Sequence, residues 1–121
     1  MAKHPCDAIV IACIDFRFQK YIRDFLDTNL KDKTYDYVGF AGSTKNLKTI
    51  LKQIAISVKL HDVKYVILIH HQECGAYGTA STPKKHAKEL HKAKEEILAK
   101  YPYLTVDLYF LDLSGAFEKV S

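Results

Sequence analysis

Short apolar runs alternate along this chain with longer segments whose apolar residues recur three or four positions apart. Four runs have the composition of buried strands, at residues 8–12, 34–40, 63–69 and 104–111. The spacing between them predicts three amphipathic helices. This alternation predicts an α/β fold of three layers, with a mainly parallel central sheet and helices on both faces.

Each predicted helix presents one apolar stripe to the sheet. The stripes consist of Phe18, Tyr21, Ile22, Phe25 and Leu26, then of Leu47, Ile50, Leu51, Ile54, Ala55 and Val58, and last of Ala87, Leu90, Ala93, Ile97 and Leu98. Residues 41–44 predict a turn with a capping residue before the second helix. Thr82 and Pro83 predict the start of the third, because a capping hydroxyl followed by proline is typical of a first helical turn.

The end of the chain predicts one more strand. Ser114 and Gly115 read as a turn, and residues 116–120 then return as a short antiparallel edge strand. In the strand order 2-1-3-4, the first and third strands are neighbours, and open parallel sheets form their sites where the order reverses. Cys13 ends the first strand, and His71 and Cys74 follow the third, so we expect these three residues to meet.

The three side chains that meet are ones that bind metal. Two thiolates and an imidazole are zinc ligands, and a set of Cys13, His71 and Cys74 leaves a fourth position open, as in catalytic zinc sites. The alternative is a buried apolar Cys13 and a solvated loop histidine. The coincidence of all three at two neighbouring strand ends favours one zinc per chain.

An acidic and a basic residue follow the first cysteine. Asp15 beside Arg17 should remain ionised and accept a hydrogen bond from a group held at the metal. The alternative is an ordinary surface ion pair, which contributes little. The neighbouring metal ligand favours the functional interpretation.

Composition excludes several classes of protein. A length of 121 residues, with 48% hydrophobic side chains, predicts a single domain, 1–121. The net charge of +4 comes without interleaved aromatic and basic residues, which argues against nucleic acid, and the lysines after Pro83 predict a solvated face. No apolar run is long enough for a membrane span. Three cysteines without a targeting segment predict a cytoplasmic protein.

These motifs resemble those of the beta-class carbonic anhydrases. The family signatures Cys-x-Asp-x-Arg and His-x-x-Cys stand here as residues 13–17 and 71–74, followed by Gly75 and Ala76. The likeness extends more loosely from about Ala8 to Val120. It implies zinc held by Cys13, His71 and Cys74, a dyad of Asp15 and Arg17, and reversible hydration of carbon dioxide to bicarbonate. In the family, the fourth zinc position is taken by water or by the aspartate.

The chain departs from the family pattern around the expected pocket. Phe16 replaces a usual serine, His70 replaces a usual glycine, and residues 39–43 replace an Arg-Asn-Ala-Gly-Asn-like segment. We expect Phe16, Phe40, Gly42 and Tyr77 to form the substrate pocket. Two alternatives therefore remain: hydrolysis of a related linear molecule, such as carbonyl sulfide or carbon disulfide, and a zinc-binding protein of this fold without catalysis.

The sequence leaves open the roles of His70 and Cys6 and the way the chains assemble. His70 competes with His71 as the ligand; in a regular strand they point to opposite faces, and the family spacing favours His71. Cys6 has no partner motif and reads as a free or buried thiol. The resemblance implies a homodimer or larger assembly. Few residues precede Ala8 to form the family's embracing arm, so we expect the apolar first helix and Phe40 to supply the contact.

Overall fold

The computed structural model describes residues 4–121 and contains the predicted alternation of strands and helices. Its elements are β1 (Ala8–Ala12), the 3-10 turn η1 (Phe16–Phe18), α1 (Gln19–Asn29), β2 (Tyr35–Gly39), α2 (Leu47–His61), β3 (Tyr65–His71), the 3-10 turn η2 (Gly78–Ala80), α3 (Pro83–Lys100), β4 (Thr105–Leu111) and β5 (Phe117–Val120). The strand order is β2-β1-β3-β4-β5, parallel except for the β4–β5 pair. The predicted α/β class, strand order and antiparallel edge strand are confirmed.

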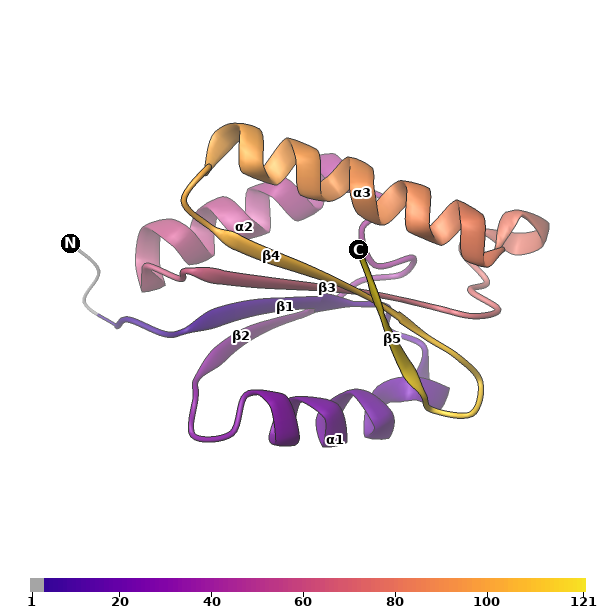
Figure 1. Ribbon diagram of the computed structural model, residues 1–121. Helices are drawn as coiled ribbons and strands as arrows, with labels where there is room; N and C mark the ends of the chain where they lie inside the picture. Colours follow the sequence, from indigo (N-terminus) through magenta and orange to yellow (C-terminus); the bar gives the residue numbers. More distant parts are fainter. Residues whose placement is uncertain (1–3) are drawn as a thin grey trace.

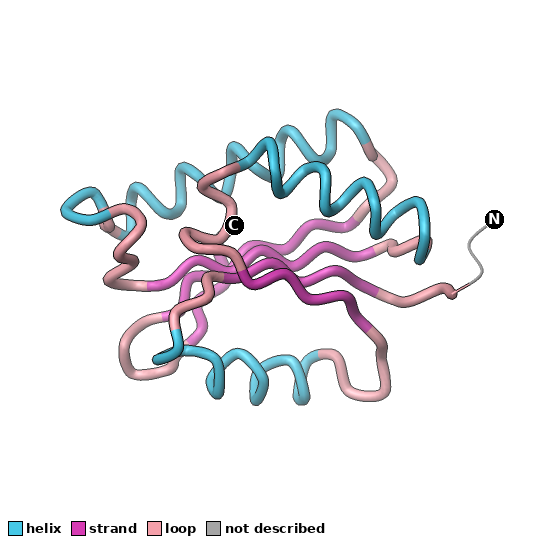
Figure 2. Tube along the Cα trace, turned by 180° about the vertical axis from the view of Figure 1, so that it is seen from behind, coloured by secondary structure: helices cyan, strands magenta, loops and turns pink. Residues whose placement is uncertain are grey.

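The helices cover the two faces of the sheet unequally. In Figure 1, α2 and α3 lie on one face and α1 lies alone on the other, and the view from behind shows the same three layers (Figure 2). Right-handed crossovers between parallel strands account for this arrangement. Because β1 and β3 pair directly, their carboxyl ends lie side by side.

Alternate residues of the strands form two cores. Ile9 and Ile11 of β1 pack with α2 and α3, whereas Val10 and Ala12 pack with α1. All residues of β1 are buried, which explains why the run lacks a polar position. The period of two continues to the end of β3, so His70 and His71 are directed to opposite faces of the sheet.

The largest differences from the predicted element boundaries are at β3 and at the start of α2. Strand β3 runs to His71 rather than ending at Ile69, because His70 and His71 continue the ladder with Phe110 and Leu111. The cap of α2 is Asn46, whose side chain accepts a hydrogen bond from Thr49 N–H, so it lies outside the segment 41–44. Thr82 and Pro83 begin α3 as predicted.

Most of the apolar residues expected to form a subunit contact are not on the surface, although Tyr21 of α1 is 38% exposed. Phe18, Ile22 and Leu26 are buried in the core beneath the sheet. Phe25 stacks on Phe117 at a centroid distance of 4.0 Å, and Phe40 packs into the core on the α2 and α3 side. The edge strand β5 thus covers part of the apolar surface of α1, through the contact between Phe117 and Phe25.

None of the helices formed by residues 4–121 combines the length and apolar character that a membrane crossing requires.

Candidate metal centre

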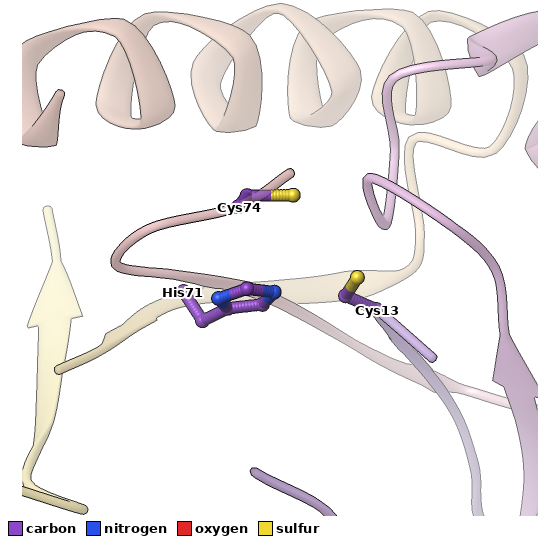
Figure 3. Close-up of side chains that lie close together, drawn as sticks. All are labelled: Cys13, His71 and Cys74. Atoms are coloured by element: carbon purple, nitrogen blue, oxygen red, sulfur yellow. The ribbon is translucent and has the colours of Figure 1, made fainter. Parts of the chain in front are cut away.

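Cys13, His71 and Cys74 converge at the carboxyl ends of β1 and β3. Cys13 directly follows β1, His71 is the last residue of β3, and Cys74 lies in the turn after it. Their ligand atoms all lie within 4.8 Å of one another, and all three residues are buried. Figure 3 shows the two sulfur atoms and the imidazole ring gathered around one space. The structure therefore brings together the three residues that the sequence pointed to.

The imidazole of His71 is prepared to act as a ligand through one nitrogen. Its Nδ1 lies 2.7 Å from the carbonyl oxygen of Gln72. A carbonyl only accepts, so Nδ1 carries the proton and Nε2 presents its lone pair. Nε2 is buried and has no hydrogen-bond partner in the described chain. The ring of Phe18 stacks on the imidazole, with 4.3 Å between the ring centroids, and restrains its orientation. A buried lone pair without a partner costs free energy, and a metal ion would satisfy it.

The two thiols share a strongly polar environment. A hydrogen bond with Cys74 is the main reason that the pKa of Cys13 is lowered, and His71 and the Gly42 N–H add to the effect. The same shared proton, together with burial, raises the pKa of Cys74. One sulfur is therefore ionised at neutral pH, and a divalent cation would displace the remaining proton.

The backbone conformation and close packing next to Cys13 require a glycine at position 42. Its N–H donates to Cys13 Sγ at 3.4 Å, which stabilises negative charge on the sulfur. A Cβ at this position would lie 2.9 Å from Cβ of Lys45 and 3.1 Å from Cβ of Ala76, and the backbone φ is +81°. Only glycine gives both this conformation and this close approach at no steric cost.

Asp15 and Arg17 form a rigid pair beside the three ligands. Arg17 donates to both carboxylate oxygens, from Nη2 to Oδ2 at 2.8 Å and from Nε to Oδ1 at 3.1 Å. These hydrogen bonds are the main cause that lowers the pKa of Asp15, so the carboxylate is ionised and can only accept. Asp15 Oδ2 lies 3.9 Å from Nε2 of His71, at the edge of the space that the ligands surround.

Arg17 also connects the two segments that carry the cysteines. Its Nη2 donates to the carbonyl of Glu73 at 3.1 Å, and its Nη1 lies 3.2 Å from Oε1 of Glu73. Glu73 has a left-handed backbone with φ of 55°, unusual for a residue other than glycine. Glu73 was not predicted as a site residue, because no pattern in the sequence marks it.

A chain of buried polar side chains supports Cys74 from the α3 side of the sheet. The Cys74 N–H donates to Ser81 Oγ at 2.9 Å, and Ser81 Oγ lies 2.8 Å from Nε2 of His86. His86 Nδ1 lies 2.8 Å from Nδ1 of His70, whose Nε2 lies 2.7 Å from Thr44 Oγ1. We call Thr44, His70, His86 and Ser81 the histidine chain.

The histidine chain assigns His70 a role different from that of its neighbour. Both ring nitrogens of His70 form hydrogen bonds, one with Thr44 and one with His86, so neither is available as a ligand in place of His71. The chain ties the Cys74 turn to Thr44, in the loop whose Gly42 contacts Cys13. Ser81 and His86 were not predicted, because only packing of α3 on β3 brings them to His70.

The four residues expected in the substrate pocket are placed unequally. Gly42 contacts Cys13, and Tyr77 packs against Cys13 and Cys74. Phe16 lies beside the site but is 86% exposed. Phe40 packs into the core on the α2 and α3 side and is absent from the cluster around the cysteines. The structure thus gathers Gly42 and Tyr77 at the ligands, leaves Phe16 at the exposed rim beside Cys13, and places Phe40 in the core.

The fold is similar to that of solved carbonic anhydrases. That of Streptococcus mutans superposes with a TM-score of 0.72, covering 100% of this chain and 86% of the other, at 12% identity. The two tetrameric beta-carbonic anhydrases of Sordaria macrospora give a TM-score of 0.59, covering 98% of this chain and 82% of the other, at 16% identity. The beta-carbonic anhydrase CafA of Aspergillus fumigatus gives 0.56, covering 98% and 76%, at 16% identity. At these identities the likeness shows the fold alone.

Sequence comparison extends over nearly the whole chain. An uncharacterised protein of Rickettsia bellii is 30% identical over 136 aligned positions, covering 97% of this chain and 83% of the relative. One of Rickettsia conorii is 29% identical over 136 positions, covering 97% and 73%. The model of the family described as "Putative carbonic anhydrase" matches residues 3–121. The chain therefore belongs to this carbonic anhydrase family.

Proposed function

We propose that this protein is a zinc-dependent carbonic anhydrase that interconverts carbon dioxide and bicarbonate. The observation that carries the proposal is the cluster of Cys13, His71 and Cys74, with the buried Nε2 of His71 directed at it without a partner. Two sulfur donors and one nitrogen donor match the preference of zinc and leave one position for solvent. Zinc bound there would lower the pKa of a water ligand to about 7 and so supply a nucleophile near neutral pH.

The role of Asp15 follows from its protonation state and its position. Asp15 is ionised and held through both oxygens by Arg17. It would accept a hydrogen bond from solvent at a bound metal and so orient that solvent toward the substrate. The same hydrogen bonds from Arg17 occupy both carboxylate oxygens, which favours solvent over Asp15 as the fourth ligand. Glu73 and the backbone of Arg17 in turn fix the guanidinium and the carboxylate.

The approach to the site suits a small uncharged substrate. A hollow of about 510 Å³ is lined by residues 13–17 and has Cys13 in its wall. Ile14 and Phe16 give this entrance an apolar character, while the charge of Arg17 at its border is paired with Asp15 and Glu73. Carbon dioxide would cross the apolar part.

Stopped-flow measurement of carbon dioxide hydration by the zinc-loaded protein tests the proposal directly. We expect turnover above the uncatalysed rate, abolished by a chelator and restored by zinc. A zinc-loaded protein that hydrolyses carbonyl sulfide but does not hydrate carbon dioxide would replace the substrate in this proposal. A zinc-loaded protein inactive on both would leave it a metal-binding protein.

Substituting Arg17 should lower activity without removing zinc. In Arg17→Ala, Asp15 loses the guanidinium donors and the link to Glu73 and keeps only the backbone N–H at Oδ1, so we expect kcat/KM for hydration to fall about 10- to 100-fold. Arg17→Lys keeps the charge and loses the planar pair of donors, and should be intermediate. Zinc content measured on the same samples separates the two effects. Full activity in Arg17→Ala would remove the dyad from the mechanism.

Substituting Ser81 should weaken metal binding. Ser81→Ala leaves the Cys74 N–H and His86 Nε2 without their shared partner, so the turn carrying Cys74 is less constrained. We expect zinc affinity to fall about 10-fold or more, measured by competition with a chromophoric chelator. Ser114→Ala is the matched control, because its hydroxyl bonds only to Asp112, in the turn between β4 and β5 and outside the histidine chain. Equal affinities for both variants would show that the histidine chain does not position Cys74.

We propose that the protein assembles as a homodimer or larger through the apolar surface beside the site. Ile14 is 60% exposed, Phe16 86% and Tyr37 41%. The Sordaria macrospora neighbours, described as tetrameric, support an oligomer. Light scattering at increasing dilution should show Phe16→Ser dissociating at higher concentration than the wild type, while Leu60→Ser, on the far end of α2, behaves normally. A wild type that is monomeric at every concentration would contradict this assembly.

A further inference from the structure

A second group of metal-binding side chains lies at the other end of the sheet. Cys6, Asp36 and His61 offer ligand atoms that all lie within 4.8 Å of one another, and each residue is half-buried. Cys6 precedes β1, whereas Cys13 follows it, so the two groups are separated by about 20 Å along an extended strand. The cluster therefore belongs to neither the proposed active site nor its supporting residues.

The three side chains are held by independent contacts. The backbone N–H of Cys6 donates to the carbonyl of His61 at 2.9 Å, which fixes the start of the chain to the end of α2. Asp36 comes from the second position of β2, and its Oδ2 lies 2.7 Å from Nδ1 of His61. Ser57, one turn before His61, donates to the same oxygen at 2.6 Å. Three separate elements thus present sulfur, oxygen and nitrogen donors to one point.

A nucleophilic cysteine is the other chemistry that these residue types suggest, and the electrostatics oppose it. Burial, and then the charge of Asp36, raise the pKa of the Cys6 thiol, so the thiol is protonated at neutral pH. Burial alone would raise the pKa of Asp36, but hydrogen bonds from Ser57 and His61 outweigh it and lower the pKa. A neutral thiol beside an ionised carboxylate is a poor nucleophile. It becomes a ligand once a cation displaces its proton.

We propose that Cys6, Asp36 and His61 form a second metal site, selective for a divalent transition metal of the zinc type. A thiolate and an imidazole favour such an ion over magnesium or calcium, which prefer oxygen ligands. Binding releases the thiol proton of Cys6, and the ion replaces the hydrogen bond between His61 and Asp36. Ser57 remains on the carboxylate and orients it. The exposed ring of His4, 6.4 Å from that of His61 between centroids, is near enough to supply a fourth donor by side-chain rotation.

The stoichiometry of zinc in untagged protein tests this site apart from the first. After dialysis against zinc and removal of free metal, elemental analysis should give two ions per chain in the wild type and one in Cys6→Ser or His61→Gln. The double variant Cys13→Ser/Cys74→Ser should keep one ion, and Asp36→Asn in that background should remove it. Circular dichroism establishes that each variant is folded.

A second measurement uses the reactivity of Cys6 itself. In the Cys13→Ser/Cys74→Ser background Cys6 is the one remaining thiol, and zinc should slow its alkylation by iodoacetamide at least 10-fold, whereas magnesium should not. A wild type that binds one ion, with Cys6→Ser unchanged and no protection of Cys6, would overturn the second site. It would leave the first site intact. The second site would also be overturned if the Cys13→Ser/Cys74→Ser variant lost all its zinc while Cys6→Ser and His61→Gln lost none.

Discussion

Replacing Cys13 with serine should abolish zinc binding at the proposed active site and lower carbon dioxide hydration by ~10³-fold or more. The serine hydroxyl is a far weaker zinc ligand than a thiolate, and the two remaining ligands, His71 and Cys74, do not complete a tetrahedral site. Without the ion, no group in the cluster lowers the pKa of a water molecule to near 7. Zinc content and the initial hydration rate, measured on the same preparation, check the prediction.

Controls separate the loss of a ligand from the loss of the fold. Cys13 packs with Cys74 and Tyr77 and is 7% exposed, so a serine there fits the same space and the circular dichroism should be unchanged. Cys6→Ser is the matched control for the hydration rate, since it removes a thiol of the same chain while leaving this cluster intact. If Cys13→Ser still bound zinc through His71 and Cys74 and retained wild-type hydration, the ligand assignment would be wrong.

Acid should destabilise the metal-free protein in a range above that of ordinary carboxylates. Burial, and then the charge of the neighbouring ring, lower the pKa of His70 to about 3, and burial lowers the pKa of His86 to about 4. Unfolded histidine has a pKa of about 6.5, so below pH 6.5 the unfolded chain binds more protons than the folded one. The stabilisation is complete above pH 6.5 and is lost as the pH falls toward 4. From these two histidines we expect the free energy of unfolding to decrease by up to about 5 kcal/mol between pH 7 and pH 4.5.

Urea unfolding at a series of pH values measures this loss. The metal-free state is used so that release of zinc from the thiolates does not contribute to the slope. In His86→Gln the side chain cannot titrate in this range but keeps an amide that forms hydrogen bonds, so the part of the pH slope that comes from the two histidines should fall by about half. An unchanged slope in His86→Gln would mean that the acid sensitivity originates outside the histidine chain.

The metal cluster and the fold were accessible from the sequence for a simple reason. Parallel strands alternating with helices have a restricted set of orders, and in the order found here the ends of β1 and β3 are adjacent. Cys13, His71 and Cys74 stand at those ends, so their meeting depends only on backbone topology. The cap at Thr82 and Pro83 was equally local, because both residues act within one helical turn.

Interactions between side chains of different elements were decided only by the tertiary structure. Strand β3 includes His70 and His71 because the β4 ladder supplies backbone partners whatever the side chain. The histidine chain requires α3 to be packed at one rotation on β3, and the sequence spacing of Ser81, His86 and His70 does not specify that rotation. The outward position of Phe16 depends on η1, whose 3-10 turn buries Phe18 instead.

The sequence by itself therefore determined which backbone ends meet and which ligands they carry. These follow from hydrophobic periodicity and the handedness of crossovers, which are properties of segments. The tertiary structure alone decided that Arg17 joins Asp15 to Glu73, that His70 is a supporting residue, and that Cys6 lies with Asp36 and His61. Each of these depends on where side chains from separate segments pack, to within the length of a hydrogen bond, and short-range patterns in a sequence do not fix positions so closely.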